Sequence, residues 1–122
     1  MTLIDTSSWI EQLRSKGDPL IRSRVESLLH TGQAAWCAVV RLELWAGVGS
    51  DEERAILRAY TQELPDLPIA DEVWEEGCAL ASRCRKTGRT APASDLLIAA
   101  CARYHEVQIE TADAHFEFLM KL

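Results

Sequence analysis

Short apolar runs alternate with longer amphipathic segments along the whole chain, and this alternation is the feature that most constrains its fold. The runs at 2–4, 34–38, 65–70 and 107–110 predict four strands. Two prolines confine the third run to a short edge strand, and the fourth strand is predicted to be central. Strands that alternate with helices form parallel sheets covered on both faces. We therefore expect an α/β protein with one domain over residues 1–122, a three-layer α/β/α sandwich with a central, mostly parallel sheet.

Capping residues mark the helices between these runs. Ser7 or Ser8 can cap a helix that ends near Leu13, and Asp18 followed by proline begins a second helix that ends at Gly32. Further helices are expected at about 40–46, from 51, at 71–86, at 93–104 and from 114. In the helix at 71–86, the side chains expected to face the core are Val73, Trp74, Cys78, Leu80 and Ala81.

The charge balance limits what the protein can bind. The chain has 19 Asp and Glu against 13 Lys and Arg, so its formal net charge is −6. Nonspecific affinity for nucleic acid comes largely from neutralised phosphates, so broad binding of this kind is disfavoured. A nucleic-acid enzyme is still compatible with the charge, because a bound metal ion reverses the sign of the field where a phosphate must sit.

The four cysteines form no metal-binding or disulfide pattern. No Cys-x-x-Cys pair occurs, and no cysteine has zinc-finger spacing from a histidine. Cys37, Cys78 and Cys101 lie in apolar segments, so we expect reduced thiols that pack in the core. The N-terminal segment lacks the basic and apolar parts of a signal peptide, and no apolar stretch reaches the ~20 residues of a membrane span. We expect a cytoplasmic protein with no membrane partner.

Four carboxylates, Asp5, Glu43, Asp95 and Asp113, each lie at the edge of an apolar segment. Asp5 and Asp113 follow predicted strands, and the carboxyl ends of parallel strands border the ligand crevice. Asp95 begins a helix, whose N-terminus points to the same edge. Carboxylates that meet repel one another unless a cation compensates, and Mg²⁺ or Mn²⁺ suits oxygen ligands. Each aspartate taken alone is equally compatible with a helix cap or a dipole partner.

The segments around these acids resemble the four acidic motifs of the PIN domain. The motifs are LIDTSSWIE, RLELWAG, ASDLLIAACA and TADAHF. Their order and spacing are most similar to the short VapC-type ribonuclease toxins of bacterial and archaeal toxin–antitoxin pairs. The resemblance covers essentially the whole chain and implies a PIN-like fold.

The resemblance also implies a function and a set of site residues. The implied activity is a Mg²⁺- or Mn²⁺-dependent endoribonuclease that hydrolyses phosphodiester bonds in a structured RNA, such as tRNA or rRNA. The implied partners are a cognate antitoxin and a second copy of the chain, within a larger toxin–antitoxin complex. Ser7 would support the first acid, and Thr111 matches the Thr of the family's Thr-x-Asp-x-x-Phe pattern. Ala112 departs from the family, since many relatives carry Arg or another polar residue there. The residues that would bind metal and catalyse are Asp5, Glu43, Asp95 and Asp113.

Other side chains are weaker candidates. Glu117, one helical turn after Asp113, can hold a second metal through water. His115 lies near the acids and can reach substrate, although a lone histidine is more often structural or solvated. A basic stretch offers either an RNA-backbone track or partners for a helix C-terminus; it contains Arg83, Arg85, Lys86 and Arg89. An apolar groove for the antitoxin tail is expected near Trp9, Leu13, Trp45 and Val48.

Three other functions are compatible with a small acidic α/β protein. A receiver-type signalling domain requires paired acids after the first strand, but only Asp5 lies there. A haloacid-dehalogenase-like phosphatase requires a second aspartate at position 7, which is Ser7. A PIN-like binding module without catalysis is the third alternative, and the intact set of four acids argues against it. RNA cleavage assays separate the enzyme from the binding module, and an acyl-phosphate test identifies the receiver.

Overall fold

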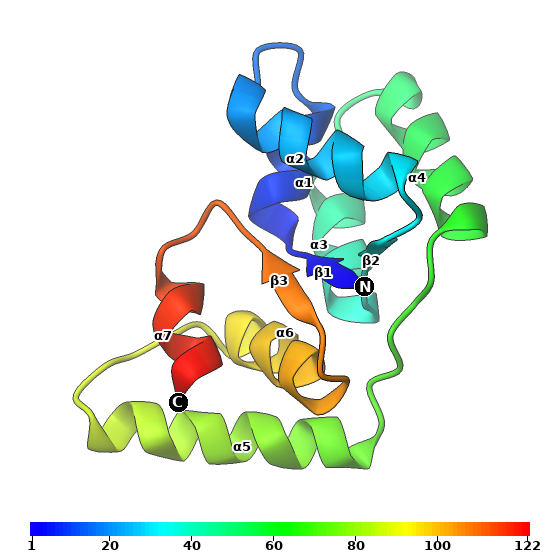
Figure 1. Ribbon diagram of the computed structural model, residues 1–122. Coiled ribbons are helices and arrows are strands. Elements are labelled where there is room, and N and C mark those ends of the chain that lie inside the picture. The colour runs from blue at the N-terminus through cyan, green and yellow to red at the C-terminus, as the bar shows by residue number, and fades with distance from the viewer.

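The computed structural model describes all residues from 1 to 122 and contains three strands and seven helices (Figure 1). In chain order these are β1 (Thr2–Ile4), α1 (Thr6–Leu13), α2 (Pro19–His30), β2 (Ala34–Ala35), α3 (Ala38–Gly47), α4 (Asp51–Glu63), α5 (Asp71–Lys86), α6 (Ala93–Tyr104), β3 (Gln108–Glu110) and α7 (His115–Lys121).

The three strands form a parallel sheet in the order β2-β1-β3. Figure 1 shows α1 to α4 on one side of this sheet and α5, α6 and α7 on the other. The predicted three-layer α/β/α architecture with a parallel sheet is therefore confirmed. None of the helices has the length and apolar character that crossing a membrane requires.

The register of β1 and β3 brings two predicted site segments together. Thr2 pairs with Gln108, and Ile4 pairs with Glu110, so both strands end at the same level. The Asp5 N–H then donates to the Glu110 carbonyl oxygen at 3.0 Å. The residues that follow the two strands therefore leave the sheet side by side.

An aromatic cluster fills the core between the sheet and the upper helices. The rings of Trp9 and Trp36 are both buried, with centroids 5.9 Å apart, and the ring of Tyr60 lies 5.1 Å from that of Trp9. On the other side of the sheet, six consecutive residues of α6 from Leu97 to Ala102 are buried. A helix buried on all faces must be covered by neighbours, and α5 and α7 provide that cover.

The final helix α7 has only seven residues, and side chains of two other helices form hydrogen bonds to its C-terminal end. Its Phe116 and Leu119 are buried. The Arg103 guanidinium of α6 donates to the carbonyls of Leu119 at 3.0 Å and Met120 at 3.2 Å. Arg83 of α5 donates to the carbonyl of Leu122 at 3.3 Å. These bonds satisfy carbonyl groups that the end of a helix leaves without partners.

Two of the predicted strands differ in extent from the expectation. The strand expected at 34–38 stops at Ala35, because α3 already begins at Ala38. The edge strand expected at 65–70 is reduced to an isolated bridge between Trp36 and Asp66. Pro68 lacks the N–H group that would extend it. The prediction that 107–110 is central was wrong, since β3 is at the edge of the sheet and β1 is in the middle.

The inward face of α5 was also predicted incorrectly in part. Val73, Leu80 and Cys84 are the buried residues of this helix, whereas Trp74 is 56% exposed and Cys78 is exposed. Neighbouring helix positions differ by about 100° in direction, and the packed face of α5 is the one that carries Val73, Leu80 and Cys84, which leaves Trp74 outside it. The expectation of buried reduced thiols holds for Cys37 and Cys101 but not for Cys78.

Candidate functional site

Asp5 lies at the centre of the site, directly after β1 and at the N-cap of α1. Its side chain is buried, with 2% exposure. The Oδ1 atom accepts hydrogen bonds from the Ser7 hydroxyl at 2.7 Å and the Ser8 N–H at 3.2 Å. The Oδ2 atom accepts from the Thr111 hydroxyl at 2.9 Å. Asp5 is therefore a helix cap and, in addition, a carboxylate fixed from two separate segments.

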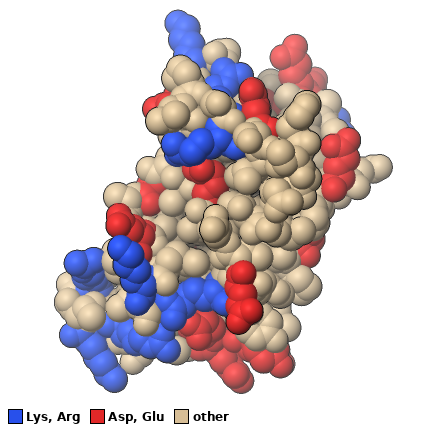
Figure 2. All heavy atoms as spheres, in the orientation of Figure 1, with Lys and Arg blue, Asp and Glu red and all other residues tan.

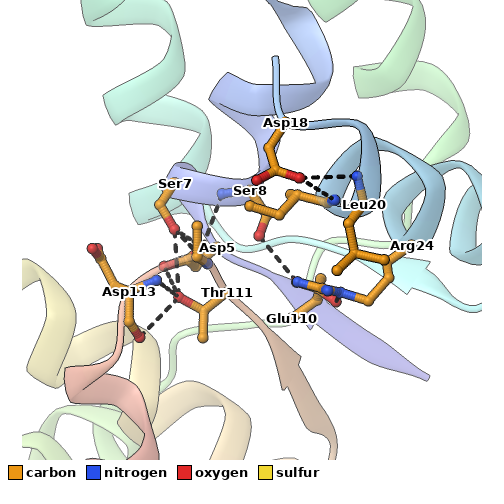
Figure 3. A network of polar contacts seen from close by, with 11 residues as sticks. Asp5, Ser7, Ser8, Asp18, Leu20, Arg24, Glu110, Thr111 and Asp113 are labelled. Atoms are coloured by element: carbon orange, nitrogen blue, oxygen red, sulfur yellow. Dashed lines mark hydrogen bonds and ion pairs between the residues drawn. The ribbon is translucent and has the colours of Figure 1, made fainter.

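Ser7 and Thr111 connect Asp5 to the loop that follows β3. The Ser7 hydroxyl oxygen accepts from the Ala112 N–H at 3.0 Å, and the Thr111 hydroxyl oxygen accepts from the Asp113 N–H at 2.9 Å. Figure 3 shows both hydroxyl groups directed toward Asp5. Each hydroxyl thus donates to the Asp5 carboxylate and accepts from the backbone of the loop. This arrangement fixes the loop, including Asp113, relative to Asp5.

Asp95, Asp113 and His115 form a compact group at the same edge. One ligand atom from each lies within 4.8 Å of the others. Asp95 is in the first turn of α6, Asp113 is in the loop before α7, and His115 is the first residue of α7. The His115 Nε2 atom lies 2.5 Å from Asp95 Oδ2. The three side chains have the spacing of a site for a divalent cation.

Glu43 approaches the site from α3 but lies outside this group. Its Oε1 atom accepts a hydrogen bond from the Thr6 hydroxyl at 2.6 Å, and the side chain is partly buried. Thr6 is the neighbour of Asp5 in the chain, so Glu43 is held one residue away from the buried carboxylate. The structure therefore places Asp95 and Asp113 in one group with His115, fixes the loop of Asp113 to Asp5, and holds Glu43 against Thr6, the residue after Asp5.

The electrostatics of the site favour a cation. Burial raises the pKa of Asp5, the hydrogen bonds from Ser7, Thr111 and Ser8 oppose this rise, and the negative charge of Asp113 adds to it. None of Asp5, Asp95 and Asp113 forms an ion pair with a lysine or arginine. Oxygen ligands with uncompensated negative charge are the donors that Mg²⁺ and Mn²⁺ prefer. The residues present thus fit a hard divalent metal ion.

A hollow of about 470 Å³ opens beside the site along α7. Its lining includes Thr111, Ala112, Asp113, Glu117 and Lys121. Glu117 accepts a hydrogen bond from Lys121 at 3.2 Å, and both side chains are exposed. The expectation that Glu117 and Asp113 share a helix face was wrong, because α7 begins after Asp113, but both residues line this hollow. Ala112 contributes a small apolar side chain to this lining.

The predicted basic stretch lies at the end of α5 and in the loop after it. Figure 2 shows lysine and arginine side chains gathered at the lower left of the molecule, where α5 ends in Figure 1. Arg83 is engaged by Glu76 at 3.9 Å, whereas Arg85 and Lys86 are exposed and form no ion pair. The Arg89 guanidinium lies 4.7 Å from the ring centroid of Phe118 on α7. The stretch therefore extends from α5 to the helix that His115 begins.

Two contacts at the site, between His115 and Asp95 and between Thr6 and Glu43, were not predicted from the sequence. His115 was expected to be structural or to reach substrate, but it contacts a candidate acid directly. A signal was present, since His115 lies two residues after Asp113 at the start of a helix. Thr6 was not singled out at all, and no local pattern indicates that its hydroxyl meets Glu43, which lies 37 residues later.

Comparison with known proteins gives one consistent family. A family model described as the PIN domain matches residues 2–119. VapC ribonuclease Mb1587 of Mycobacterium bovis is 29% identical over 126 residues, covering 100% of this chain and 93% of the relative. Ribonuclease VapC19 of Mycobacterium tuberculosis is 32% identical over 118 residues, covering 95% of this chain and 92% of the relative.

A solved structure shows the same fold. It is VapBC-5 from Mycobacterium tuberculosis, a member of the VapBC family of toxin–antitoxin systems. Its matching chain has a TM-score of 0.67 and 24% sequence identity, covering 97% of this chain and 89% of that chain.

The burial of Asp5 has a consequence for stability. In metal-free protein at neutral pH, we expect Asp5→Asn to be more stable than the wild type. The pKa of Asp5 is raised above 3.8, mainly by burial, so the folded protein binds this proton more tightly than the unfolded chain does. Wild-type stability should therefore fall as pH rises from about 3.8 through the folded-state pKa, and the variant should lack this loss.

Urea unfolding of both proteins in chelator, from acidic to neutral pH, measures the difference. Glu26→Gln, an exposed change on α2, is the control and should follow the wild-type pH dependence. A stability difference between Asp5→Asn and wild type that does not change with pH would contradict the prediction.

Proposed function

Because the chain belongs to the PIN domain family, we propose that it is a metal-dependent endoribonuclease and the toxin of a toxin–antitoxin pair. The observation that carries this proposal is the group of Asp95, Asp113 and His115 beside the buried Asp5. Carboxylates gathered without a lysine or arginine partner are costly without a cation, so the arrangement favours a metal site over a purely structural network. The names of the relatives as ribonucleases support RNA as the substrate.

Mg²⁺ or Mn²⁺ is the proposed metal. When bound, such an ion polarises a phosphate oxygen and lowers the pKa of a bound water, which is the chemistry of phosphodiester hydrolysis. Carboxylate oxygens suit Mg²⁺ and Mn²⁺ equally well as a class of donor, and His115 is already engaged by Asp95 through Nε2. The residues that would hold the metal and catalyse are Asp5, Glu43, Asp95 and Asp113, with Glu117 as an outer ligand for a second ion.

Each protein group has a distinct part in this proposal. Asp5 is held by Ser7 and Thr111, so its orientation is fixed before any ligand arrives. The contact between His115 and Asp95 orients that carboxylate, as a partner behind a metal ligand commonly does. Glu43 is held by Thr6 at the rim, where a carboxylate can position a water molecule between itself and the scissile phosphate.

The basic stretch is the proposed track for the RNA backbone. Arg85 and Lys86 are exposed without ion pairs, and Arg89 stacks on Phe118 of α7. These cations lie beside the acidic edge in a protein of net charge −6, so they provide few phosphate contacts. Few contacts give weak nonspecific affinity, and we infer that selection of the target depends on the shape of a structured RNA such as tRNA or rRNA.

A hollow between α1 and α3 supports a site for an antitoxin tail. It has a volume of about 250 Å³ and is lined by Leu13, Val48 and Glu43, among others. Its apolar side chains lie beside two carboxylates, Glu43 and Glu53, and one cation, Arg14. Such a lining suits a peptide with an apolar face and an arginine, whose fork pairs with carboxylates. Trp9 was predicted for this groove wrongly, because its side chain is completely buried. The likeness to VapBC-5, a member of a family of toxin–antitoxin systems, supports an antitoxin partner.

An apolar surface between α5 and α6 supports a homodimer. Trp74 is 56% exposed beside a hollow of about 190 Å³, which is lined by Gly77, Cys78, Ala81, Ala93, Leu96 and Leu97 as well as by Trp74 itself. A large exposed aromatic side chain beside an apolar hollow is typical of surfaces that become buried on association. We propose that two copies of the chain meet here.

The enzyme proposal is tested by metal removal and by Asp95→Asn. Chelation should abolish RNA cleavage by the wild type, and Mg²⁺ or Mn²⁺ should restore it. Asp95→Asn should lower the rate at least about 100-fold, because a direct ligand matters more than its outer partners. Added metal should raise the melting temperature of the wild type and not of the variant.

Glu72→Gln, an exposed change on α5, is the control and should cleave at the wild-type rate. A wild type that binds neither metal in calorimetry and cleaves no RNA would favour the binding-module alternative.

The RNA track is tested by neutralising Arg85 and Arg89. Arg85→Gln with Arg89→Gln should raise the KM for a cleaved RNA, lower the slope of affinity against salt by about 1 per lost phosphate contact, and leave Mg²⁺ affinity unchanged. Arg54→Gln on α4 is the matched control. RNA-end sequencing after brief induction should show one or two discrete cuts in stable RNA. Cuts scattered over all messenger RNA would contradict selection by shape.

The dimer is tested by Trp74→Glu, which places two like charges at the proposed contact. We expect the wild type to sediment as a dimer and the variant as a monomer. Leu20→Glu, at a position that is 66% exposed on α2, should remain dimeric. If Trp74→Glu is still a dimer, the two copies meet at a surface other than the one proposed. A monomeric wild type would refute the dimer.

A further inference from the structure

Glu110 is a second nearly buried carboxylate near Asp5, and it has three donors of its own. Its side chain is 11% exposed. The Arg24 guanidinium of α2 donates from Nε to Oε1 at 2.7 Å and from Nη2 to Oε2 at 3.2 Å. The buried Ser8 hydroxyl donates to Oε2 at 3.2 Å. A two-point contact of this kind fixes both the distance and the orientation of a carboxylate.

Ser8 and the end of β3 connect this ion pair to the acidic site. The Ser8 N–H donates to Asp5, and the Ser8 hydroxyl donates to Glu110, so one residue bridges the two carboxylates. The Glu110 carbonyl accepts from the Asp5 N–H, and the next residue, Thr111, holds both Asp5 and Asp113. The position of Glu110 therefore sets where the loop with Asp113 begins.

The ion pair lies away from the proposed metal ligands. Figure 3 shows Arg24 and Glu110 on one side of Asp5 and Asp113 on the other. Glu110 is occupied by its own donors, so it is not available as a further metal ligand. Its charge is compensated by Arg24, whereas Asp5 and Asp113 form no ion pair with a lysine or arginine.

We infer that Arg24 and Glu110 act as a positioning pair, which holds the loop after β3 against Asp5 and so arranges the acidic site for its metal ion. The inference rests on the proposed function. The strand β3 has only three residues, and the loop after it is bonded to α1 through Ser7 and to Asp5 through Thr111. The Arg24 contact adds an anchor from a third element, α2. Partners that orient metal ligands commonly affect metal affinity by about one to two orders of magnitude.

Arg24→Met tests the inference, because the loss of positive charge and the loss of the contact with Glu110 should change metal affinity in opposite directions. The loss of a cation near clustered acids should by charge alone strengthen the binding of a divalent ion. The loss of an anchor should weaken it. We expect Arg24→Met to weaken Mn²⁺ or Mg²⁺ binding about tenfold in calorimetry and to lower kcat about tenfold, with little change in the KM for RNA.

Arg22→Met is the matched control. It removes a cation from the same helix, where Arg22 contacts only the carbonyl of Ser15, at 3.3 Å. Its metal affinity should be unchanged or slightly increased. The double variant Arg24→Met with Glu110→Gln should lose no more metal affinity than the more impaired of the two single variants. Both changes break the same contact, so their effects should not add. Arg24→Lys keeps the positive charge but not the two-point contact, and it should show a smaller loss of metal affinity than Arg24→Met.

Two outcomes would overturn the inference while leaving the proposed function intact. One is a wild type that binds metal and cleaves RNA, with Arg24→Met matching Arg22→Met in metal affinity and kcat. The other is an Arg24→Lys variant identical to the wild type, which is decisive if Arg24→Met does not fold. A wild type that binds no metal and cleaves no RNA would instead refute the proposed function.

Discussion

The parallel pairing of β1 with β3, which the Asp5 N–H closes on the Glu110 carbonyl, is the constraint on which the site depends. Because the two strands end at one level, the residues after them meet even though they lie at opposite ends of the chain. Two hydroxyl groups, from Ser7 and Thr111, then complete the contact by bonding a carboxylate on one side and a backbone N–H on the other. A shift of one residue in this register would turn every side chain of the strand to the opposite face and separate these groups.

The same geometry buries or nearly buries two carboxylates, Asp5 and Glu110, and only one of them has a positively charged partner. Asp5 is buried with hydrogen bonds but no counter-ion, whereas Glu110 nearby has a complete arginine partner. Most buried acids in stable proteins resemble Glu110, since an ionised group without compensation disfavours the folded state. This contrast between two carboxylates joined by a single serine supports the proposal that Asp5 binds a cation and that Glu110 has a structural role.

The sequence was sufficient for the architecture, because strand ends, helix caps and apolar periodicity are local signals, whereas the catalytic roles of the four acids stay a prediction. Asp5 illustrates the limit of such signals, since the pattern predicted either a cap or a site and the structure shows one residue in both geometries. Contacts that depend on distant pairing were not predictable. The bond from Thr6 to Glu43 and the fork from Arg24 to Glu110 join segments whose approach only the packed helices determine. Trp74 was misplaced for a related reason, because apolar character alone does not distinguish a core face from a surface that another chain can cover.

The attachment of α7 has a dynamic consequence. A helix of seven residues is too short to persist in water by itself, so its order depends on the burial of Phe116 and Leu119 and on the arginine bonds to its last carbonyls. Such an element can detach as a local unit at a smaller free-energy cost than global unfolding. Detachment would carry His115 away from Asp95 while β1, α1 and the aromatic cluster stay folded. The completeness of the acidic edge is thus linked to the fraction of time for which the C-terminal helix is docked, and amide hydrogen exchange along α7 reports that fraction directly.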